Sequence, residues 1–218
     1  MKQIIVQKDI LKDNKDVMKR NKEKLDKNKV FTINLLGSPG GGKTSLLEEI
    51  IKNMKSQINM SIIEGDLYTT KDAKRIEKYN VDVIQLNTEG ACHLHSSMIE
   101  EAINQIQLKD LDLLVIENIG NLICTASYDL GEDIKITVMS VTEGNDKPLK
   151  YPHIFQKSKA VILNKIDIIE HTNFDIDEFH KDIKSLNENI DILKTSCVTG
   201  EGIEDLCRYI QKNIKNKK

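Results

Sequence analysis

Proline is scarce in this sequence, and long apolar runs are missing altogether. Three prolines in 218 residues leave no proline-rich linker, and the length suits one α/β domain with a sizeable core. No apolar run approaches the roughly 20 residues of a membrane-spanning helix. The N-terminus has scattered charges where a signal peptide would have an apolar centre. We therefore expect one cytoplasmic domain with no membrane partner.

A strong net charge is also absent. The formal net charge is -2, whereas a nucleic-acid or membrane-surface partner would favour a basic face. Cysteine is rare, with four residues in the chain, and in a reducing cytoplasm such residues seldom form disulfides. Each is expected to be a metal ligand, a nucleophile or a small core residue. The composition thus predicts neither a nucleic-acid partner nor a disulfide framework.

The N-terminal part of the chain differs in pattern from the rest. Residues 8–29 are rich in lysine, with a few apolar residues at a plausible helical spacing. We expect a solvated amphipathic helix here, whose charges solvate one face and bind no partner. From residue 30 onward, short apolar runs alternate with helical segments. Residues 1–29 are therefore predicted to be a helical extension, and residues 30–218 a single domain.

Seven short apolar runs define the predicted sheet of this domain. Their lengths, β-branched residues and nearly continuous hydrophobicity suit strands that are buried on both faces. Their alternation with helical segments predicts an α/β fold, with a mainly parallel sheet and helices on both faces. The predicted strands are 30–36, 60–65, 81–86, 112–118, 134–140, 159–164 and 191–196, and the helical segments include 44–56, 96–107, 175–187 and 202–214.

Directly after the first predicted strand comes GSPGGGKTS, which fits the pattern G-x-x-x-x-G-K-[ST]. Glycines let the backbone aim N–H groups at phosphate oxygens, and the following helix adds its positive end. Lys43 would reach the β- and γ-phosphates as a catalytic residue, and Thr44 would supply a hydroxyl to Mg²⁺. A dinucleotide fingerprint fails, because Ser45 stands where its third glycine belongs. The domain is expected to be a P-loop NTPase whose phosphate-binding residues are Gly37, Gly40, Gly41, Gly42, Lys43, Thr44 and Ser45.

A second segment, NKID, follows a later strand at a position typical of guanine-reading loops. Asp167 can accept from both guanine N1–H and the exocyclic amine, Asn164 can address the O6/N7 edge, and Lys165 can cover the ring. The segment TSCVTGEG follows the last strand, where GTPases carry another base-contacting loop, and it includes Ser196 and Cys197. The order of these segments favours GTP over ATP.

Three acidic residues are candidates for the magnesium site or a nucleotide switch. Glu117 ends a predicted strand, and an acidic residue there typically orders Mg²⁺ directly or through water. Asp66 and Asp72 follow the second core strand and are candidate metal or switch residues. Capping of a helix N-terminus is an equally good explanation for these two.

A possible transition-metal site comes from Cys92, His93 and Cys124. Cys124 follows Glu117 by seven residues, at most about 25 Å of chain, and Cys92 and His93 follow the predicted strand 81–86. All three are therefore expected near the carboxyl edge of the sheet. Two thiolates and an imidazole suit Zn²⁺ or square-planar Ni²⁺. Lone cysteines are also common in cores, and His95 could add a ligand or face solvent. From the residues alone, both explanations stay open.

Several segments in this order resemble the hydrogenase-maturation GTPases of the HypB family. The resemblance covers roughly residues 30–214, and its most discriminating segments are GACHL and ENIGNLICTASYDLGE, supported by LLGSPGGGKTSLLE, EGD, VTEGNDKPLKYP, NKID and TGEG. The relative that assists urease typically carries a Cys-Pro-His motif, whereas here an alanine precedes the cysteine and histidine follows it directly.

This resemblance implies a GTP-hydrolysing metallochaperone that helps insert nickel into [NiFe] hydrogenase. It implies a GTP-dependent homodimer, with Ni²⁺ or Zn²⁺ held by Cys92, His93 and Cys124 at the interface. It also implies that Lys150 reaches toward the partner's nucleotide, although a solvated loop lysine is the alternative. A nickel-delivery protein and the hydrogenase large subunit are the expected partners. Turnover should be slow, because the sequence offers no evident arginine finger.

Two other functions compete with this one. A GTPase chaperone for urease or a cobalamin enzyme would share the phosphate and base loops, but GACHL argues against it. A metal-binding regulatory module could use the nucleotide only to lock the dimer. Complete phosphate and Mg²⁺ residues favour an enzyme, and release of phosphate distinguishes the two.

Overall fold

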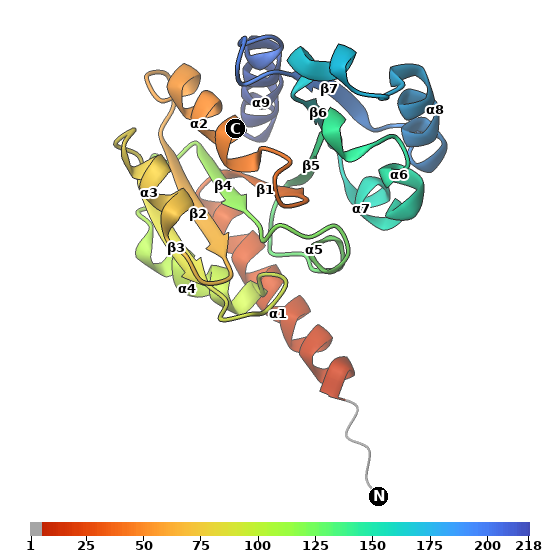
Figure 1. Ribbon diagram of the computed structural model, residues 1–218. Coiled ribbons are helices and arrows are strands. Elements are labelled where there is room, and N and C mark those ends of the chain that lie inside the picture. Colours follow the sequence, from red (N-terminus) through yellow and green to blue (C-terminus); the bar gives the residue numbers. More distant parts are fainter. Residues whose placement is uncertain (1–5) are drawn as a thin grey trace, which may run out of the picture.

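The computed structural model describes residues 6–218, with side chains from residue 14 onward. Seven strands form one parallel sheet, in the order β3-β2-β4-β1-β5-β6-β7 (Figure 1). The predicted parallel sheet and P-loop NTPase fold are confirmed. The strands are β1 (Phe31–Gly37), β2 (Met60–Asp66), β3 (Asp82–Asn87), β4 (Leu113–Glu117), β5 (Ile134–Ser140), β6 (Ala160–Asn164) and β7 (Asp191–Thr195).

Helices cover both faces of the sheet, as predicted. Alternate side chains of β4 enter different core clusters: Leu113 and Val115 pack with α2 (Lys43–Met54) and α9 (Ile203–Lys217), and Leu114 and Ile116 pack with α4 (Ser96–Gln105). Within residues 6–218, no helix is both long enough and apolar enough to cross a membrane. The α-helices are α1 (Val6–Lys27), α2 (Lys43–Met54), α3 (Lys71–Glu77), α4 (Ser96–Gln105), α5 (Cys124–Ser127), α6 (Lys147–Lys150), α7 (Pro152–Lys157), α8 (Ile176–Leu186) and α9 (Ile203–Lys217), with 3₁₀ turns at η1 (Val141–Glu143) and η2 (Ile166–His171).

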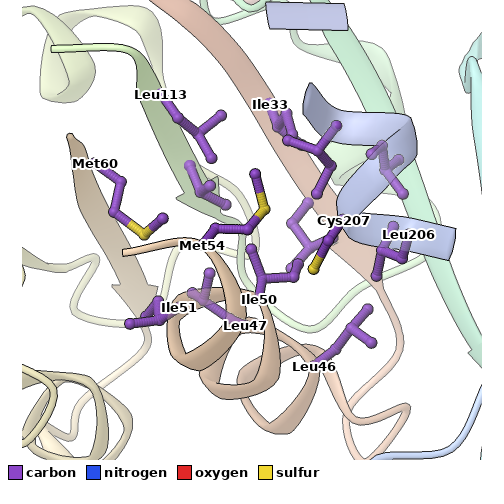
Figure 2. Packing of buried hydrophobic residues seen from close by; sticks show 14 of the residues in the cluster. Ile33, Leu46, Leu47, Ile50, Ile51, Met54, Met60, Leu113, Leu206 and Cys207 are labelled. Carbon is purple, nitrogen blue, oxygen red and sulfur yellow. The ribbon is translucent and has the colours of Figure 1, made fainter. Parts of the chain in front are cut away.

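The largest core cluster joins α2 and α9 to the middle of the sheet. Leu47 and Met54 of α2 share one apolar cluster with Leu206 and Cys207 of α9 and with Ile33 of β1 (Figure 2). Cys207 is almost fully buried among these apolar side chains. It is therefore a core residue, which agrees with leaving it out of the metal site.

The two edge strands depart from the sequence prediction. Side chains of β3 and β7 are mostly half-buried, whereas all seven strands were predicted to be buried on both faces. That part of the prediction is wrong for β3 and β7. Each of them has a neighbouring strand on one side only, at opposite ends of the sheet (Figure 1), and is therefore less covered.

Helix α1 is more closely integrated than a solvated helix would be. It packs alongside α4, while its first turns project beyond the rest of the domain (Figure 1). Leu25 joins the core cluster of α4, and Asn21 is 1% exposed. The lysines do solvate the outer face, but the inner face is part of the fold. The sequence pattern did not predict this buried face, because α1 has few apolar residues and part of the buried face is polar.

Strand register sets the position of the site. Leu35 of β1 pairs with Glu117 of β4, and Glu64 of β2 pairs with the same Glu117. In a parallel sheet all carboxyl ends meet at one edge, so the loops after β1, β2 and β4 emerge side by side.

Replacement of a core leucine tests the packing of α2 and α9 against the sheet. Leu47 is fully buried, so Leu47→Ala removes apolar contacts and leaves a cavity. We expect the free energy of unfolding in urea to fall by about 2–5 kcal/mol. The control is Leu149→Ala, since Leu149 is 56% exposed, and its effect should stay within about 0.5 kcal/mol. Equal effects of the two changes would contradict the described core.

Candidate functional site

The phosphate loop connects β1 to α2 and depends on glycines. A Cβ at Gly37 would lie 2.3 Å from the carbonyl oxygen of Val138. Gly42 has φ +97°, and a Cβ there would lie 2.4 Å from Nδ2 of Asn164. Lys43 Nζ donates to the carbonyl oxygens of Gly37 (3.4 Å) and Ser38 (3.3 Å). An anion in the loop would meet this ammonium together with the positive end of α2.

A cavity of about 440 Å³ opens beside this loop. Its volume is in the range of small-molecule sites. It brings together most of the predicted nucleotide residues from four separate segments of the chain. Its lining includes Gly40, Gly42, Lys43, Thr44, Ser45, Asp66, Asp72, Glu117 and Lys165, and also Glu64 and Arg75, which sequence analysis did not single out.

Two buried carboxyl groups form the floor of the site. Glu117 is 3% exposed and Glu64 2% exposed. Glu117 Oε1 accepts a hydrogen bond from Thr44 Oγ1 at 2.8 Å, while Oε2 of each glutamate has no hydrogen-bond partner. Burial raises the pKa of Glu64 to about 11, and the Glu117 charge adds to this effect. Burial also raises the pKa of Glu117, against the opposing influence of Lys43.

This group of oxygens fits a magnesium ion. Two orphaned carboxylate oxygens and a hydroxyl are hard ligands of the kind that Mg²⁺ prefers. Thr44 and Glu117 were predicted for this role, and Glu64 is an addition. A signal was present in the sequence, because Glu64 interrupts the otherwise apolar strand MSIIEG.

The segment after β2 places Asp66 and Asp72 on the cavity wall. Asp66 Oδ1 accepts from the backbone N–H groups of Tyr68 (2.9 Å) and Thr69 (2.7 Å). Although burial acts in the opposite direction, these donors lower the pKa of Asp66. Asp66 thus binds a turn and lines the cavity, but it does not cap a helix, because α3 begins at Lys71 with Thr70 at its N-cap.

Asp72 belongs to a small ion-pair cluster on the same wall. It lies in the first turn of α3 and pairs with Arg75 at 3.1 Å. Arg75 also donates to Glu48 at 2.6 Å and to Ser45 Oγ at 3.0 Å. One of the three arginines therefore does reach the cavity, held there by two carboxylates.

The predicted base loop is tied to the phosphate loop. Asn164, which is 1% exposed, donates from Nδ2 to the Gly41 carbonyl at 3.2 Å and accepts from Thr195 Oγ1 at 3.1 Å. Lys165 Nζ donates to the Gly40 carbonyl at 2.7 Å. The Asn164 amide thus binds protein groups in this structure, and its contact with a base stays a prediction.

The last loop packs against the same segment. Ser196 Oγ donates to Asp167 Oδ1 at 2.6 Å, which orients that carboxylate. Cys197 Sγ lies 3.8 Å from Asn164 Oδ1, and burial raises the pKa of its thiol to about 11. The structure therefore brings the two predicted base-contacting segments together.

Cys92, His93 and Cys124 form the candidate transition-metal site. Their ligand atoms all lie within 4.8 Å of one another, and Cys92 Sγ is 3.6 Å from His93 Nδ1. A hydrogen bond with Cys92 raises the pKa of Cys124, and burial adds to the increase. Burial, followed by the neighbouring His95, lowers the pKa of His93 to about 4. The imidazole is therefore neutral near pH 7, which is the form that binds a metal.

Aromatic side chains hold the imidazole of this site. The His93 ring stacks on Tyr128 with centroids 3.8 Å apart and planes 21° apart. His95 meets His93 edge-on at 4.4 Å and lies at the N-cap of α4. Among the side chains that the structure describes, His95 is outside the ligand cluster, although it packs against it.

Lys150 lies away from the cavity of its own chain. It is in α6, forms an ion pair with Asp146, and its side chain is 62% exposed. It is absent from the described residues that line the cavity. The Lys150 side chain is therefore accessible from outside the chain.

Asn121 links the phosphate loop to the candidate metal cluster of Cys92, His93 and Cys124, and Asn118 approaches the same cluster from the end of β4. The backbone N–H of Asn121 donates to the Gly37 carbonyl at 3.0 Å, and its Oδ1 accepts from Cys124 N at 3.0 Å. Asn118 Oδ1 is 3.4 Å from the backbone N of Leu94, next to His93. Both asparagines stand in the segment between Glu117 and Cys124, so one short stretch contacts both sites.

Comparisons with known proteins agree with this geometry. The sequence model of the family described as "CobW/HypB/UreG, nucleotide-binding domain" matches residues 31–194. The hydrogenase maturation factor HypB of Escherichia coli (strain K12) is 40% identical over 210 residues, which are 96% of this chain and 72% of that protein. The probable hydrogenase maturation factor HypB of Methanocaldococcus jannaschii is 38% identical, over 98% of this chain and 96% of that protein.

A solved structure is similarly close in shape. The crystal structure of HypB from Helicobacter pylori in complex with nickel superposes with a TM-score of 0.89 at 36% identity, covering 94% of this chain and 96% of that one. Sequence and fold therefore agree over nearly the whole length. The chain belongs to the CobW/HypB/UreG family of nucleotide-binding P-loop proteins and, within it, to the HypB hydrogenase maturation factors.

Proposed function

We propose that this chain is a GTP-hydrolysing metallochaperone that helps insert nickel into [NiFe] hydrogenase. One observation carries the proposal: Asn121 binds the Gly37 carbonyl of the phosphate loop and the backbone N of Cys124 in the metal triad. The names of the relatives, and the nickel in the Helicobacter pylori protein, support hydrogenase maturation and nickel as the cargo.

GTP is the proposed nucleotide, and Mg²⁺ its metal. Asp167, oriented by Ser196, would accept from the two donors on the Watson–Crick edge of guanine. Thr44 and Glu117 would hold Mg²⁺, which when bound neutralises charge on the phosphate oxygens. Lys43 would bind the β- and γ-phosphates. Because Arg75 is engaged by Glu48 and Asp72, we expect slow hydrolysis.

Coupling between nucleotide and cargo follows from the short segment after Glu117. A γ-phosphate in the loop would change the position of Gly37 or Glu117, and the segment would carry that change to Cys124. The coupling free energy equals the difference in metal affinity between the GTP and GDP states, commonly about 1–3 kcal/mol. Such a difference biases nickel transfer without very tight binding.

A second copy of the chain would complete the metal site. The three ligands supply fewer donors than four-coordinate Ni²⁺ or Zn²⁺ takes, and a symmetric pair would supply six. Ile123, beside Cys124, is 65% exposed, and Leu149, beside Lys150, is 56% exposed. Burial of these apolar side chains would favour a dimer formed around GTP, with Lys150 reaching the partner's nucleotide. The nickel-delivery protein and the hydrogenase large subunit would meet this dimer.

Hydrolysis is tested with a lysine variant. Lys43→Ala removes the only ammonium that we place on the phosphates, and phosphate release from GTP should fall by about 100-fold or more. The control, Lys52→Ala, removes an exposed lysine of the same helix and should hydrolyse GTP normally. Absence of phosphate release from the unmodified protein would favour the regulatory module, in which the nucleotide only locks the dimer.

Base choice is tested at Asp167. In Asp167→Asn the amide can no longer accept from both guanine donors, so GDP affinity should fall by at least about tenfold, while xanthosine diphosphate should bind better than before. Calorimetric titration measures both affinities. Asp177→Asn, an exposed change in α8, should leave them unaltered. Undiminished GDP binding by Asp167→Asn would argue against the assigned base loop.

Nickel coupling is tested at Cys124. We expect Ni²⁺ affinity, measured by chelator competition, to differ by about 5-fold to 150-fold between protein loaded with GDP and with a non-hydrolysable GTP analogue. In Cys124→Ala this difference should disappear, whereas the buried-core variant Cys207→Ala should keep it. Zn²⁺ is titrated in parallel, and sizing chromatography reports dimer formation. Equal affinities in both nucleotide states would refute the coupling.

A further inference from the structure

Two buried asparagines of α1 contact both loops that carry the metal triad. Asn21, 1% exposed, donates from Nδ2 to the carbonyl oxygens of Ser96 (2.8 Å) and Leu130 (3.1 Å). Asn14, 9% exposed, accepts from the backbone N–H of Ser96 at 2.8 Å and donates to the Asp129 carbonyl at 3.1 Å. Each side chain therefore bridges the same two segments.

These anchor points are close to the metal ligands in the chain. Ser96 follows His93 by three residues and begins α4. Asp129 follows Cys124 by five residues and is next to Tyr128, whose ring stacks on His93 at 3.8 Å. The two segments also bind each other directly, because Ser96 Oγ donates to the Asp129 carbonyl at 2.8 Å.

The segment that follows Cys124 packs closely on α1, and this packing depends on a glycine. Gly131 has φ +106°, and a Cβ there would lie 2.8 Å from the Cβ of Asn21 and 3.0 Å from the backbone N of Lys22. No larger residue fits without displacing the helix. The loop is thus held against α1 by shape as well as by hydrogen bonds.

Asparagine is the residue type that this arrangement requires. Its amide offers both a donor and an acceptor, so Asn14 can accept from one loop and donate to the other. An apolar side chain would leave the backbone groups of both loops unpaired, and an aspartate could not donate.

We propose that α1 is a positioning element of the metal centre, in which Asn14 and Asn21 set the spacing between the loop of Cys92 and His93 and the loop of Cys124. This inference rests on the proposed metal site. Replacement of a group that orients metal ligands without touching the metal commonly lowers metal affinity by about 10-fold to 100-fold.

The test measures nickel and nucleotide affinities side by side. Asn14→Asp keeps the acceptor for Ser96 and loses the donor to Asp129, and Asn21→Leu loses both of its donors. We expect Ni²⁺ affinity to fall by about 10-fold to 100-fold, with a changed nickel–thiolate absorption spectrum and unaltered GDP affinity. The matched control, Arg20→Ala, cuts the exposed Arg20–Glu100 ion pair between α1 and α4 and should change neither affinity.

Three outcomes would overturn the inference. Nickel binding by Asn14→Asp with native affinity and spectrum would show that α1 does not position the ligands. A parallel loss of GDP and nickel affinity in both variants would mean that α1 supports the whole domain. If Asn21→Leu does not fold, the test rests on Asn14→Asp alone, because Asn14 is the less buried of the two asparagines. If Cys92→Ala binds nickel like the native protein, the proposed metal site itself is wrong, which separates the two failures.

Discussion

One backbone hydrogen bond, from the N–H of Asn121 to the carbonyl of Gly37, constrains much of this site. Gly37 ends β1 and begins the phosphate loop, and Glu117 ends the neighbouring strand β4 in register with Leu35. The chain leaving β4 has seven residues in which to reach Cys124, and this bond holds it against the phosphate loop on the way. One short hydrogen-bonded segment thereby joins the phosphate loop to Cys124, a candidate metal ligand.

The floor of the cavity contains two buried carboxyl groups whose ionisation is unfavourable, because burial raises the pKa of both Glu64 and Glu117. Glu64 and Glu117 are buried side by side, and one oxygen of each lacks a partner. A carboxyl group whose pKa rises on folding destabilises the fold as pH increases above its unfolded value, near 4.5 for Glu64. Lys43 offsets part of this cost at Glu117. The proposed Mg²⁺ site would account for this cost, because proteins retain locally unfavourable groups where function needs them.

Polar contacts, more than apolar ones, organise the edge of the sheet around the site. Asn118 joins β1 through Asn34 at 3.1 Å, and it also approaches Leu94 beside His93. With Asn21, it satisfies backbone and amide groups that would otherwise be buried without partners. Directional bonds of this kind specify loop positions, which apolar packing alone leaves free to slide.

Sequence alone determined the sheet, the phosphate loop and the candidate triad. All seven strands begin and end within one residue of their predicted ranges, because runs of β-branched residues and the G-x-x-x-x-G-K-[ST] pattern are local signals. Tertiary structure alone decided that Glu64 lies beside Glu117, that Arg75 reaches the cavity, and that Asn14 and Asn21 join the two segments that follow the candidate metal ligands. The partners of those asparagines are 75 to 115 residues away in the chain. No local pattern records such a pairing, since it exists only after the sheet has brought the carboxyl ends of its strands to one edge.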